Sequence, residues 1–464
     1  MKKTTSATLT AACAALALTV LTGCGSSATG STSAAATAPG PKALADHKGE
    51  VTVTLWHGLD TNSAAALDDL LARFNAAHKG RIKATAVYQG SYADALAKYT
   101  AAVRDKSTPS VLLSYDVSTG YLADAGQTVS ATALNKANPG TVDTSSLRPA
   151  AAGYYSADGK LLAVPFNTST PLLYVNTALL RKAGLPADTP LNTLAEVAAA
   201  ARTVHAKLPG VKGLDQPFDG WWTEQLTAAA GQTYCTPGNG RGGKGTTALT
   251  LTAPAQKAAI KTVADLYTSG AALDTGTAGA DAVKAFQAGK VAMIFGSSGA
   301  ADTVTSGADF TVTAHPYPLS APKASAGPVI GGAALWVNGP GHSSAEQVAS
   351  WQLIGFLTSA SAQREFAEKT GYLPINRKVD TDSSWKSFLT KNPIVKTAVT
   401  QLDGTPAVPA TAGCLTGALP QIRTDVVSAL QSAFSGRTPL DTALKNAQTA
   451  ADNDIAQYRK QAGQ

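Results

Sequence analysis

The feature that most constrains the fold of this chain is an alternation of strand-like and helix-like segments that begins at residue 51. Residues 51–56 alternate β-forming side chains and predict a strand. A helix is predicted next, because apolar side chains between Leu67 and Phe74 recur at helical spacing. The alternation continues with a strand, a helix and a strand over residues 81–87, 92–104 and 110–114. This order predicts an α/β fold in which helices cover both faces of a mostly parallel sheet.

The same alternation resumes in the middle of the chain. Capping boxes that begin at Thr193 and Ser343 each predict the start of a helix. Pro439, at a first helical position, predicts a last helix. Strands are predicted over residues 172–175 and 291–295. Because roughly 415 residues exceed what one hydrophobic core usually holds, we expect two α/β lobes.

The chain begins with a short basic segment and then an apolar one. Lys2 and Lys3 precede an apolar run over residues 7–20, which leads to Leu-Thr-Gly-Cys ending at Cys24. This order is typical of a signal peptide, predicted here over 1–24. The last four residues resemble a bacterial lipobox, in which Cys24 carries lipid; the alternative is an ordinary signal peptide. We expect an extracytoplasmic protein, lipid-anchored to the outer face of the bacterial cell membrane, with no transmembrane span.

Composition separates a linker from the globular body. Residues 25–49 are mainly Ala, Ser, Thr, Gly and Pro, which bury too little apolar surface to become ordered. They are therefore predicted to form a flexible linker. The formal net charge is +7, but Lys and Arg are scattered and not interleaved with aromatic residues. Nucleic acid is therefore not an expected partner.

The cysteines divide into two groups. Cys13 lies in the signal peptide, and Cys24 is the lipidation candidate. Cys235 and Cys414 remain, and in an oxidising compartment we expect them to form a disulfide. Two unrelated buried thiols are the alternative. Without His or Cys nearby, the pair does not form a zinc site.

Motifs of common hydrolases and metalloenzymes are missing from the sequence. No Gly-x-Ser-x-Gly elbow and no His-Glu-x-x-His pair occurs, and the six histidines are dispersed. We therefore predict no catalytic residue, no metal and no cofactor. The residues alone lead only to an extracytoplasmic α/β protein of unspecified ligand.

Several short segments, taken in their order and spacing, carry a family resemblance. They are Leu55-Trp-His57, Tyr88-Gln-Gly-Ser-Tyr92, Tyr115-Asp-Val117, Gly153-Tyr-Tyr-Ser156, Pro165-Phe-Asn-Thr-Ser-Thr-Pro171, Ile330-Gly-Gly332, Lys369-Thr-Gly-Tyr-Leu-Pro-Ile375 and Leu419-Pro-Gln-Ile-Arg423. With them the chain resembles the extracellular solute-binding proteins of ABC importers. Within that group it is similar to the binders of glycerol-3-phosphate and glycerophosphodiesters, over nearly everything from Val51 to Gln457.

The resemblance implies a set of ligand-binding residues. They are Tyr92, Asp116, Ser169, Trp221, Ser297, Gly332, Tyr372 and Arg423, with Phe218, Trp222 and Ser298 as secondary candidates. Arg423 offers a planar fork of donors that suits phosphate. Asp116 would accept hydrogen bonds from glycerol hydroxyls, and Trp221 would stack on the ligand's carbon skeleton. Gly332 would let a backbone N–H approach the ligand, and the Tyr and Ser hydroxyls can donate to its oxygens.

Two departures from the family pattern bear on the ligand. Asp116 stands where the glycerol-3-phosphate binders carry Glu, and Phe218 stands where they carry Trp. A shorter acid and a smaller ring would leave room for a headgroup beyond the phosphate. A quaternary ammonium such as choline suits an aromatic wall. Glycerophosphocholine and glycerol-3-phosphate are therefore equal expectations.

The resemblance also implies an architecture and a working cycle. One lobe is expected to take residues 50–165 and 300–352, and the other 166–299 and 353–464, with the ligand in the cleft between them. The lobes would close on the ligand, and the monomeric closed form would dock on a membrane permease driven by a cytoplasmic ATPase. The alternatives are a disaccharide-binding protein of the same fold and, from another class, a secreted phosphodiester hydrolase.

Overall fold

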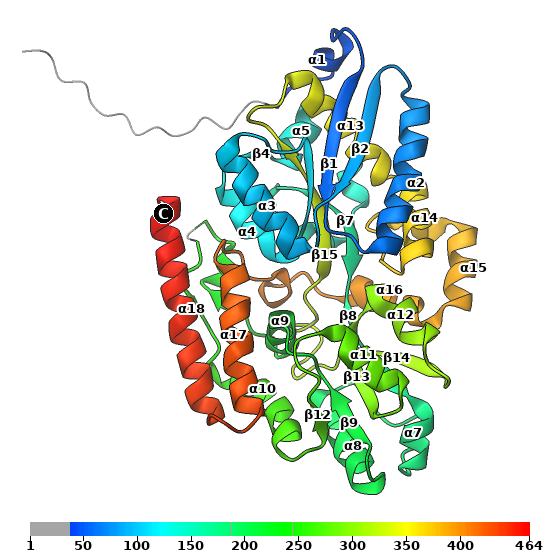
Figure 1. Ribbon diagram of the computed structural model, residues 1–464, viewed down its shortest axis with the longest axis vertical. Helices are drawn as coiled ribbons and strands as arrows, with labels where there is room; N and C mark the ends of the chain where they lie inside the picture. Colours follow the sequence, from blue (N-terminus) through cyan, green and yellow to red (C-terminus); the bar gives the residue numbers. More distant parts are fainter. Residues whose placement is uncertain (1–37, 187, 244) are drawn as a thin grey trace, which may run out of the picture. The chain divides into compact units, whose positions relative to one another are not determined.

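The computed structural model describes residues 38–186, 188–243 and 245–464 (Figure 1). The predicted signal peptide, with Cys24, and residues 25–37 of the predicted linker lie outside the described residues. The rest of that linker differs from the prediction. It contains a short helix, α1 (Lys42–Ala45), whose Leu44 is buried and accepts a 2.7 Å hydrogen bond from Nη2 of Arg81 through its carbonyl oxygen. Asn138 also donates from Nδ2 to the carbonyl oxygen of Pro39 at 2.9 Å, so contacts with distant parts of the chain order this stretch.

The first sheet is mixed and has six strands among the described residues. Its strand order is β2-β1-β3-β15-β4, and β7 also pairs with β15. The bounds are β1 (Val51–His57), β2 (Ile82–Tyr88), β3 (Val111–Tyr115), β4 (Thr128–Val129), β7 (Val164–Ser169) and β15 (Gly331–Asn338). β1 is parallel to β2 and β3, whereas β15 is antiparallel to β3. The strands predicted in this part of the sequence are confirmed.

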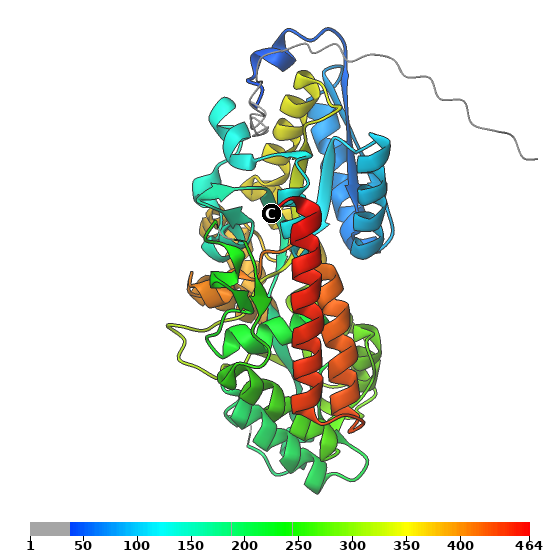
Figure 2. The ribbon, with the colours of Figure 1, turned by 90° about the vertical axis from the view of Figure 1, so that its left-hand side faces the viewer.

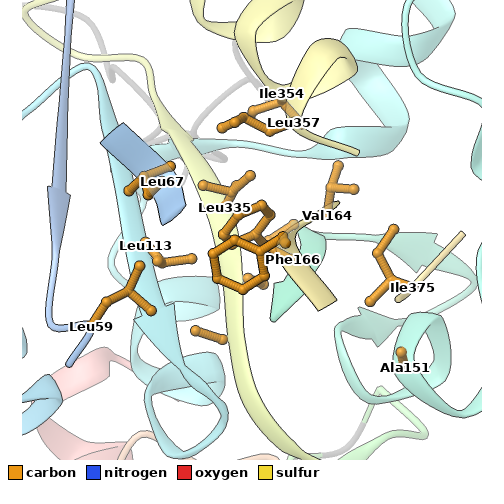
Figure 3. Packing of buried hydrophobic residues seen from close by; sticks show 14 of the residues in the cluster. Leu59, Leu67, Leu113, Ala151, Val164, Phe166, Leu335, Ile354, Leu357 and Ile375 are labelled. Atoms are coloured by element: carbon orange, nitrogen blue, oxygen red, sulfur yellow. The ribbon is translucent and has the colours of Figure 1, made fainter. Parts of the chain in front are cut away.

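Helices contribute buried side chains to the hydrophobic core that contains the apolar residues of this sheet. They are α2 (Thr61–Ala77), α3 (Tyr92–Asp105), α4 (Thr119–Asp124), α5 (Ala131–Ala137), α6 (Pro149–Tyr154), α13 (Ser344–Leu357), α14 (Ala360–Thr370), α15 (Ser383–Lys391) and α16 (Pro393–Gly404). Figure 3 shows Leu113, Phe166 and Leu335 converging from β3, β7 and β15 into the first hydrophobic core. Ile354 and Leu357 of α13 belong to the same core.

The second sheet has five strands among the described residues, in the order β12-β9-β13-β8-β14. The bounds are β8 (Pro171–Asn176), β9 (Lys212–Asp215), β12 (Ala272–Leu273), β13 (Val291–Ser297) and β14 (Val312–Pro316). Its helices are α7 (Thr177–Lys182), α8 (Leu194–Lys207), α9 (Gly220–Ala229), α10 (Pro254–Thr268), α11 (Gly279–Gln287), α12 (Ala301–Ser306), α17 (Leu419–Phe434) and α18 (Leu440–Ala462). Figures 1 and 2 show α17 and α18 lying side by side. Two short hairpins, β5 (Ser156–Ala157) with β6 (Lys160–Leu161) and β10 (Cys235–Thr236) with β11 (Ala248–Leu249), complete the strands.

Helix starts follow the local chemistry of the sequence. Thr193 and Glu196 form the predicted capping box of α8, and Ser343 caps α13. Pro439 differs from its predicted place, because it is the N-cap residue of α18 and Leu440 is the first helical residue. None of the helices in the described part of the chain is both long and apolar enough to cross a membrane.

The chain passes from the first sheet to the second through a single residue, Thr170, between β7 and β8. After residue 300, strand pairing and core packing assign some segments to the other lobe than the predicted limits do. β14 lies within 300–352 but pairs with β8 in the second sheet. Leu353 and Phe366 lie within 353–464 but belong to the first core. The positions at which the chain passes from one lobe to the other depend on contacts between residues distant in the sequence. No local sequence pattern marks them.

A covalent bridge links two distant segments of the second core. Cys235 of β10 and Cys414 form a disulfide, with Sγ atoms 2.07 Å apart and both residues buried. The bridge therefore ties β10 to the segment that leads into α17. This is the pairing predicted from the sequence.

Candidate functional site

One cavity of about 600 Å³ collects residues from both sheets. All eight residues of the predicted ligand set line it: Tyr92, Asp116, Ser169, Trp221, Ser297, Gly332, Tyr372 and Arg423. Tyr115, Asp219, Gly331 and the first residues of α17 complete most of the lining. The predicted set, drawn from segments scattered over more than 300 positions, is therefore brought together at one place.

Strand ends position much of the lining. Tyr115 is the last residue of β3, and Asp116 follows it directly. Ser169 ends β7, and Ser297 ends β13. The strands themselves are buried, so polar side chains become accessible only where they end. A cavity beyond the ends of strands is the usual ligand location in open α/β sheets.

Three charged side chains form a cluster at the cavity wall. Arg423 of α17 donates from Nε to Oε1 of Glu224 at 2.6 Å. It also donates from Nη2 to Oδ2 of Asp116 at 2.7 Å. Within the described part of the chain, Nη1 of Arg423 makes no hydrogen bond. Asp116 and Arg423 line the cavity and Glu224 does not, so Glu224 binds the guanidinium from the protein side.

Burial sets the protonation behaviour of this cluster. It raises the pKa of Glu224 to about 6, against the opposing effect of Arg423. Burial also raises the pKa of Asp116, again opposed by Arg423. Burial alone would lower the pKa of Arg423, but Glu224 and then Asp116 outweigh it and raise the pKa well above its ordinary value. The guanidinium is therefore a permanent cation.

Glycine at two positions lets backbone and side chains approach closely. A Cβ on Gly220, the first residue of α9, would lie 2.5 Å from Cβ and Cγ of Arg423. Gly332 has φ +107°, and a Cβ there would lie 1.8 Å from the carbonyl oxygen of Asn167. A larger residue at position 220 would displace Arg423, which lines the cavity, and one at position 332 would push against the backbone of β7.

Aromatic rings and hydroxyls form the rest of the lining. The rings of Tyr92 and Tyr115 stack with centroids 5.5 Å apart. The hydroxyl of Tyr92 accepts a 2.8 Å hydrogen bond from Nδ2 of Asn167. Burial raises the pKa of Tyr92 and of Tyr372, so both hydroxyls keep their protons at neutral pH and can donate them in hydrogen bonds. The lining can thus bind anionic oxygens and also face a cation with aromatic surface.

The three secondary candidates do not line the cavity. Phe218 is buried in the second core, where its ring packs on Tyr267 and Phe434. The headgroup space expected from its small ring is therefore not part of this cavity, and its size acts on core packing instead. Trp222 stacks on Tyr317 in the same core. Ser298 exchanges two hydrogen bonds with the backbone of Thr170, at 2.8 and 3.1 Å, and so holds the crossing between the sheets.

Two acidic neighbours of the cavity were not among the residues predicted from the sequence. Glu224 was not among the predicted residues, although it is a single acid in the helix Gly220–Ala229, which is buried throughout. A lone charge in an apolar helix signals a buried partner. Asp219 was missed as well. It caps α9 by accepting from the Trp221 N–H at 2.9 Å, and it lines the cavity. In the described part of the chain, no three His, Cys, Asp or Glu side chains could together hold a metal ion.

The sequence of the chain matches a known protein family. The profile described as "Bacterial extracellular solute-binding protein" matches residues 69–397. The chain is 31% identical over 413 residues to the sn-glycerol-3-phosphate-binding periplasmic protein UgpB of Yersinia enterocolitica, covering 86% of this chain and 91% of that protein. It is 30% identical over 420 residues to UgpB of Escherichia coli strain K12, covering 88% and 94%.

Solved structures agree on the fold. The crystal structure of UgpB from Mycobacterium tuberculosis in complex with glycerophosphocholine superposes with a TM-score of 0.74 at 24% identity, covering 88% of this chain and 98% of that one. The sugar-binding protein MalE of Xanthomonas citri gives 0.73 at 19% identity, covering 89% and 100%. The fold is the two-lobe fold of periplasmic binding proteins, as predicted. The chain therefore belongs to the bacterial extracellular solute-binding protein family and is the solute-binding component of an ABC importer.

Proposed function

We propose that this protein captures a glycerophosphodiester with a cationic headgroup, such as glycerophosphocholine, and delivers it to a membrane permease. The observation that carries the proposal is the guanidinium of Arg423, which lines the cavity and whose Nη1 makes no hydrogen bond among the described residues. In this proposal Nη1 donates to a phosphate oxygen of the ligand. Charge-assisted hydrogen bonds of this kind are the strong ones.

The hydroxyls around Arg423 support a ligand rich in oxygen. Tyr92, Tyr372, Ser169 and Ser297 all line the cavity, and a hydroxyl can both donate and accept. In the proposal they bind the remaining phosphate oxygens and the glycerol hydroxyls. At Gly332, which has no side chain, a backbone N–H approaches the ligand, and Trp221 covers the carbon skeleton of the ligand.

The charge of the cavity favours a zwitterion over a phosphate monoester. Arg423 pairs with two carboxylates, Asp116 and Glu224, and a third carboxylate, Asp219, also lines the cavity. A monoester dianion would add negative charge to a site that already has an excess of it. A phosphodiester carries one negative charge, and a quaternary ammonium carries a positive charge toward the Tyr92, Tyr115 and Trp221 rings.

Glycerol-3-phosphate is the second candidate, and the relatives favour it. The proteins of Yersinia enterocolitica and Escherichia coli named above are glycerol-3-phosphate-binding proteins, and this chain matches most of their length. The M. tuberculosis UgpB, in contrast, was crystallised with glycerophosphocholine. Both ligands share the glycerol and the phosphate, so both use the same proposed contacts at Arg423.

The proposed cycle uses the two groups of elements as lobes. Asp116 follows a strand of the first sheet, and Arg423 belongs to a helix of the second core. A ligand that binds residues of both groups stabilises the closed form only by its greater affinity for that form. In the proposal the closed, monomeric protein docks on the permease, and lipid on Cys24 holds it at the outer face of the cell membrane.

Isothermal titration calorimetry tests the ligand. The panel is glycerophosphocholine, glycerol-3-phosphate, inorganic phosphate, choline and maltose. We expect glycerophosphocholine to bind at least about tenfold more tightly than glycerol-3-phosphate, or about 1.4 kcal/mol, and the last three compounds to bind weakly. Maltose binding more tightly than both phosphate esters would instead indicate the sugar-binding alternative. Glycerophosphocholine should be recovered unchanged after prolonged incubation, whereas release of choline would indicate a hydrolase.

A further inference from the structure

We propose that Glu224 is a positioning residue, which fixes the orientation of the Arg423 guanidinium so that Nη1 meets the anionic group of the ligand. This inference rests on the proposed function, because it takes Arg423 as the phosphate-binding group. Glu224 was not predicted from the sequence, and it does not line the cavity. Its role is therefore exerted through Arg423 and not by contact with the ligand.

Two hydrogen bonds from different elements define the plane of the guanidinium. Glu224 of α9 accepts from Nε at 2.6 Å, and Asp116 after β3 accepts from Nη2 at 2.7 Å. The guanidinium is planar, with five N–H donors in a fixed geometry. Two anchored nitrogens therefore fix the direction of the third. Nη1 is the nitrogen that remains without a hydrogen bond to the described residues.

Helix α9 supports the whole length of the Arg423 side chain. Gly220 and Glu224 are four residues apart, so they lie on the same face of the helix. At Gly220 a missing Cβ makes room for Cβ and Cγ of Arg423, and at Glu224 a carboxylate receives Nε. The side chain of Glu224 is 1% exposed and that of Arg423 is 13% exposed. The pair is thus held on the protein side while the far end of the guanidinium faces the cavity.

A simpler role would be charge neutralisation, in which Glu224 only balances a buried cation. The two roles predict opposite effects. A carboxylate beside the guanidinium weakens its attraction for an anion, so removing the charge should tighten binding if balance is all that matters. If orientation matters, losing the acceptor for Nε should weaken binding. Glu224→Gln removes the charge and keeps an acceptor oxygen, whereas Glu224→Ala removes both.

The test compares these two variants by calorimetry with glycerophosphocholine. We expect Glu224→Ala to bind at least about tenfold more weakly than the unmodified protein, and Glu224→Gln to stay within about threefold. Equal affinities for the two variants, or tighter binding in both, would overturn the proposal. If Glu224→Ala does not fold, as judged by circular dichroism, Glu224→Gln decides alone, and tenfold tighter binding by that variant contradicts positioning.

A second measurement tests, without any ligand, whether the Arg423 guanidinium is held in place by its Nε–H hydrogen bond. Spectra of the free protein labelled with ¹⁵N-arginine report the Nε–H of Arg423, whose signal is assigned by its loss in Arg423→Lys. We expect slow solvent exchange of this N–H in the unmodified protein and in Glu224→Gln, and fast exchange in Glu224→Ala. Slow exchange in Glu224→Ala would overturn the proposal whatever ligand the protein binds. The expected exchange pattern without binding of any phosphate ester would instead overturn the proposed function alone.

Asp215→Asn is the matched control. Asp215 is a buried carboxylate at the end of β9 that accepts a 2.7 Å hydrogen bond from the Thr275 hydroxyl and does not line the cavity. Its substitution removes a buried acid of the second sheet without touching Arg423. We expect affinity for glycerophosphocholine and the exchange of the Arg423 N–H to stay unchanged in this variant. A change as large as that of Glu224→Ala would mean that any buried acid in this region acts alike, and the proposal would be wrong.

Discussion

Arg423 and Asp116 are 307 positions apart in the sequence, yet Nη2 of Arg423 donates to Oδ2 of Asp116 at 2.7 Å. The contact joins helix α17 to the turn that follows β3, and it lies at the wall of the cavity. Both side chains are largely buried, with exposed fractions of 13% and 7%. An ion pair in such surroundings has two consequences, one for stability and one for binding.

Arg423→Ala should abolish binding of phosphate esters and also destabilise the fold. The substitution leaves Asp116 and Glu224 buried without the cation that pairs with them. Breaking a buried ion pair lowers the free energy of unfolding by about 3–5 kcal/mol. Arg423→Lys keeps the charge but not the planar fork, so it should retain more stability and still bind at least about tenfold more weakly. Calorimetry and urea unfolding measure the two effects. Near-normal affinity in Arg423→Lys would show that the fork geometry is unimportant.

Gly220→Ala should weaken both folding and binding, because the new methyl group would overlap the stem of Arg423 at 2.5 Å. Overpacking of this kind costs about 1–3 kcal/mol. The chain offers a matched control in Gly279, which is likewise the first residue of its helix, but where an added methyl group would meet no heavy atom within 4 Å. Gly279→Ala should leave thermal stability and affinity unchanged or slightly raise stability. Equal behaviour of the two variants would contradict the close approach of α9 and α17.

Particular residues show which parts of the fold and of the site could be predicted from the sequence. Tyr92 and Ser169 were predicted for the site, and they line the cavity, because short segments of the chain carry the family pattern in order. Strand β3 was predicted because a short run of consecutive apolar residues, here 111–113, is typical of a buried strand. Glu224 was missed, because a charged residue in a helix is usually on the surface, and only packing against α17 reveals its partner.

Phe218 illustrates the opposite error. It lies three residues before Trp221, which lines the cavity, but its ring points into the core formed with Tyr267 and Phe434. Phe218 precedes the helix that carries Trp221, so sequence spacing does not tell which way its side chain points. The lobe crossings were difficult for a related reason: β14 pairs with β8, more than 130 residues earlier in the chain, and no local signal marks that pairing.

Tyr92→Phe should weaken ligand binding by about threefold to tenfold, the usual effect of losing one hydrogen bond. The Tyr92 hydroxyl accepts from Asn167, which leaves its own proton for an oxygen of the ligand. Tyr99 on the same helix is a matched control, because its hydroxyl bonds to Asn338 and does not reach the cavity. Tyr99→Phe should lower stability and leave affinity unchanged by calorimetry. Unchanged affinity in both variants would remove Tyr92 from the proposed ligand contacts.

Replacing both Cys235 and Cys414 by Ala should lower the free energy of unfolding by about 2–5 kcal/mol. The bridge closes a long loop, since its two residues are 179 positions apart. The oxidised protein should weigh two hydrogens less than the reduced one by intact mass spectrometry. Identical masses before and after reduction would show free thiols, and an equal unfolding midpoint in the double variant would show that the bridge adds no stability.

The pH dependence of stability should reveal the buried acid Asp215. Burial raises its pKa to about 7, opposed by the hydrogen bond from Thr275. Because the raised pKa belongs to the folded state, folding favours the protonated acid. The stabilising contribution is complete below the unfolded pKa, near 4, and is lost as pH rises through about 7. Asp215→Asn does not ionise, so its stability relative to the unmodified protein should rise from pH 4 to pH 7 and then level off.

Asp143 provides the opposite case, and urea unfolding at a series of pH values measures the stability of both variants. A hydrogen bond from Lys378, with help from Ser145, lowers its pKa to about 2. Its contribution is therefore complete above the unfolded pKa and is lost as the pH falls through the folded value. Asp143→Asn should lose stability relative to the unmodified protein as pH rises from 2 to 4, with a small amplitude because the group is exposed to solvent. A parallel pH profile for the two variants would mean that Asp215 is not held in its protonated form by the fold.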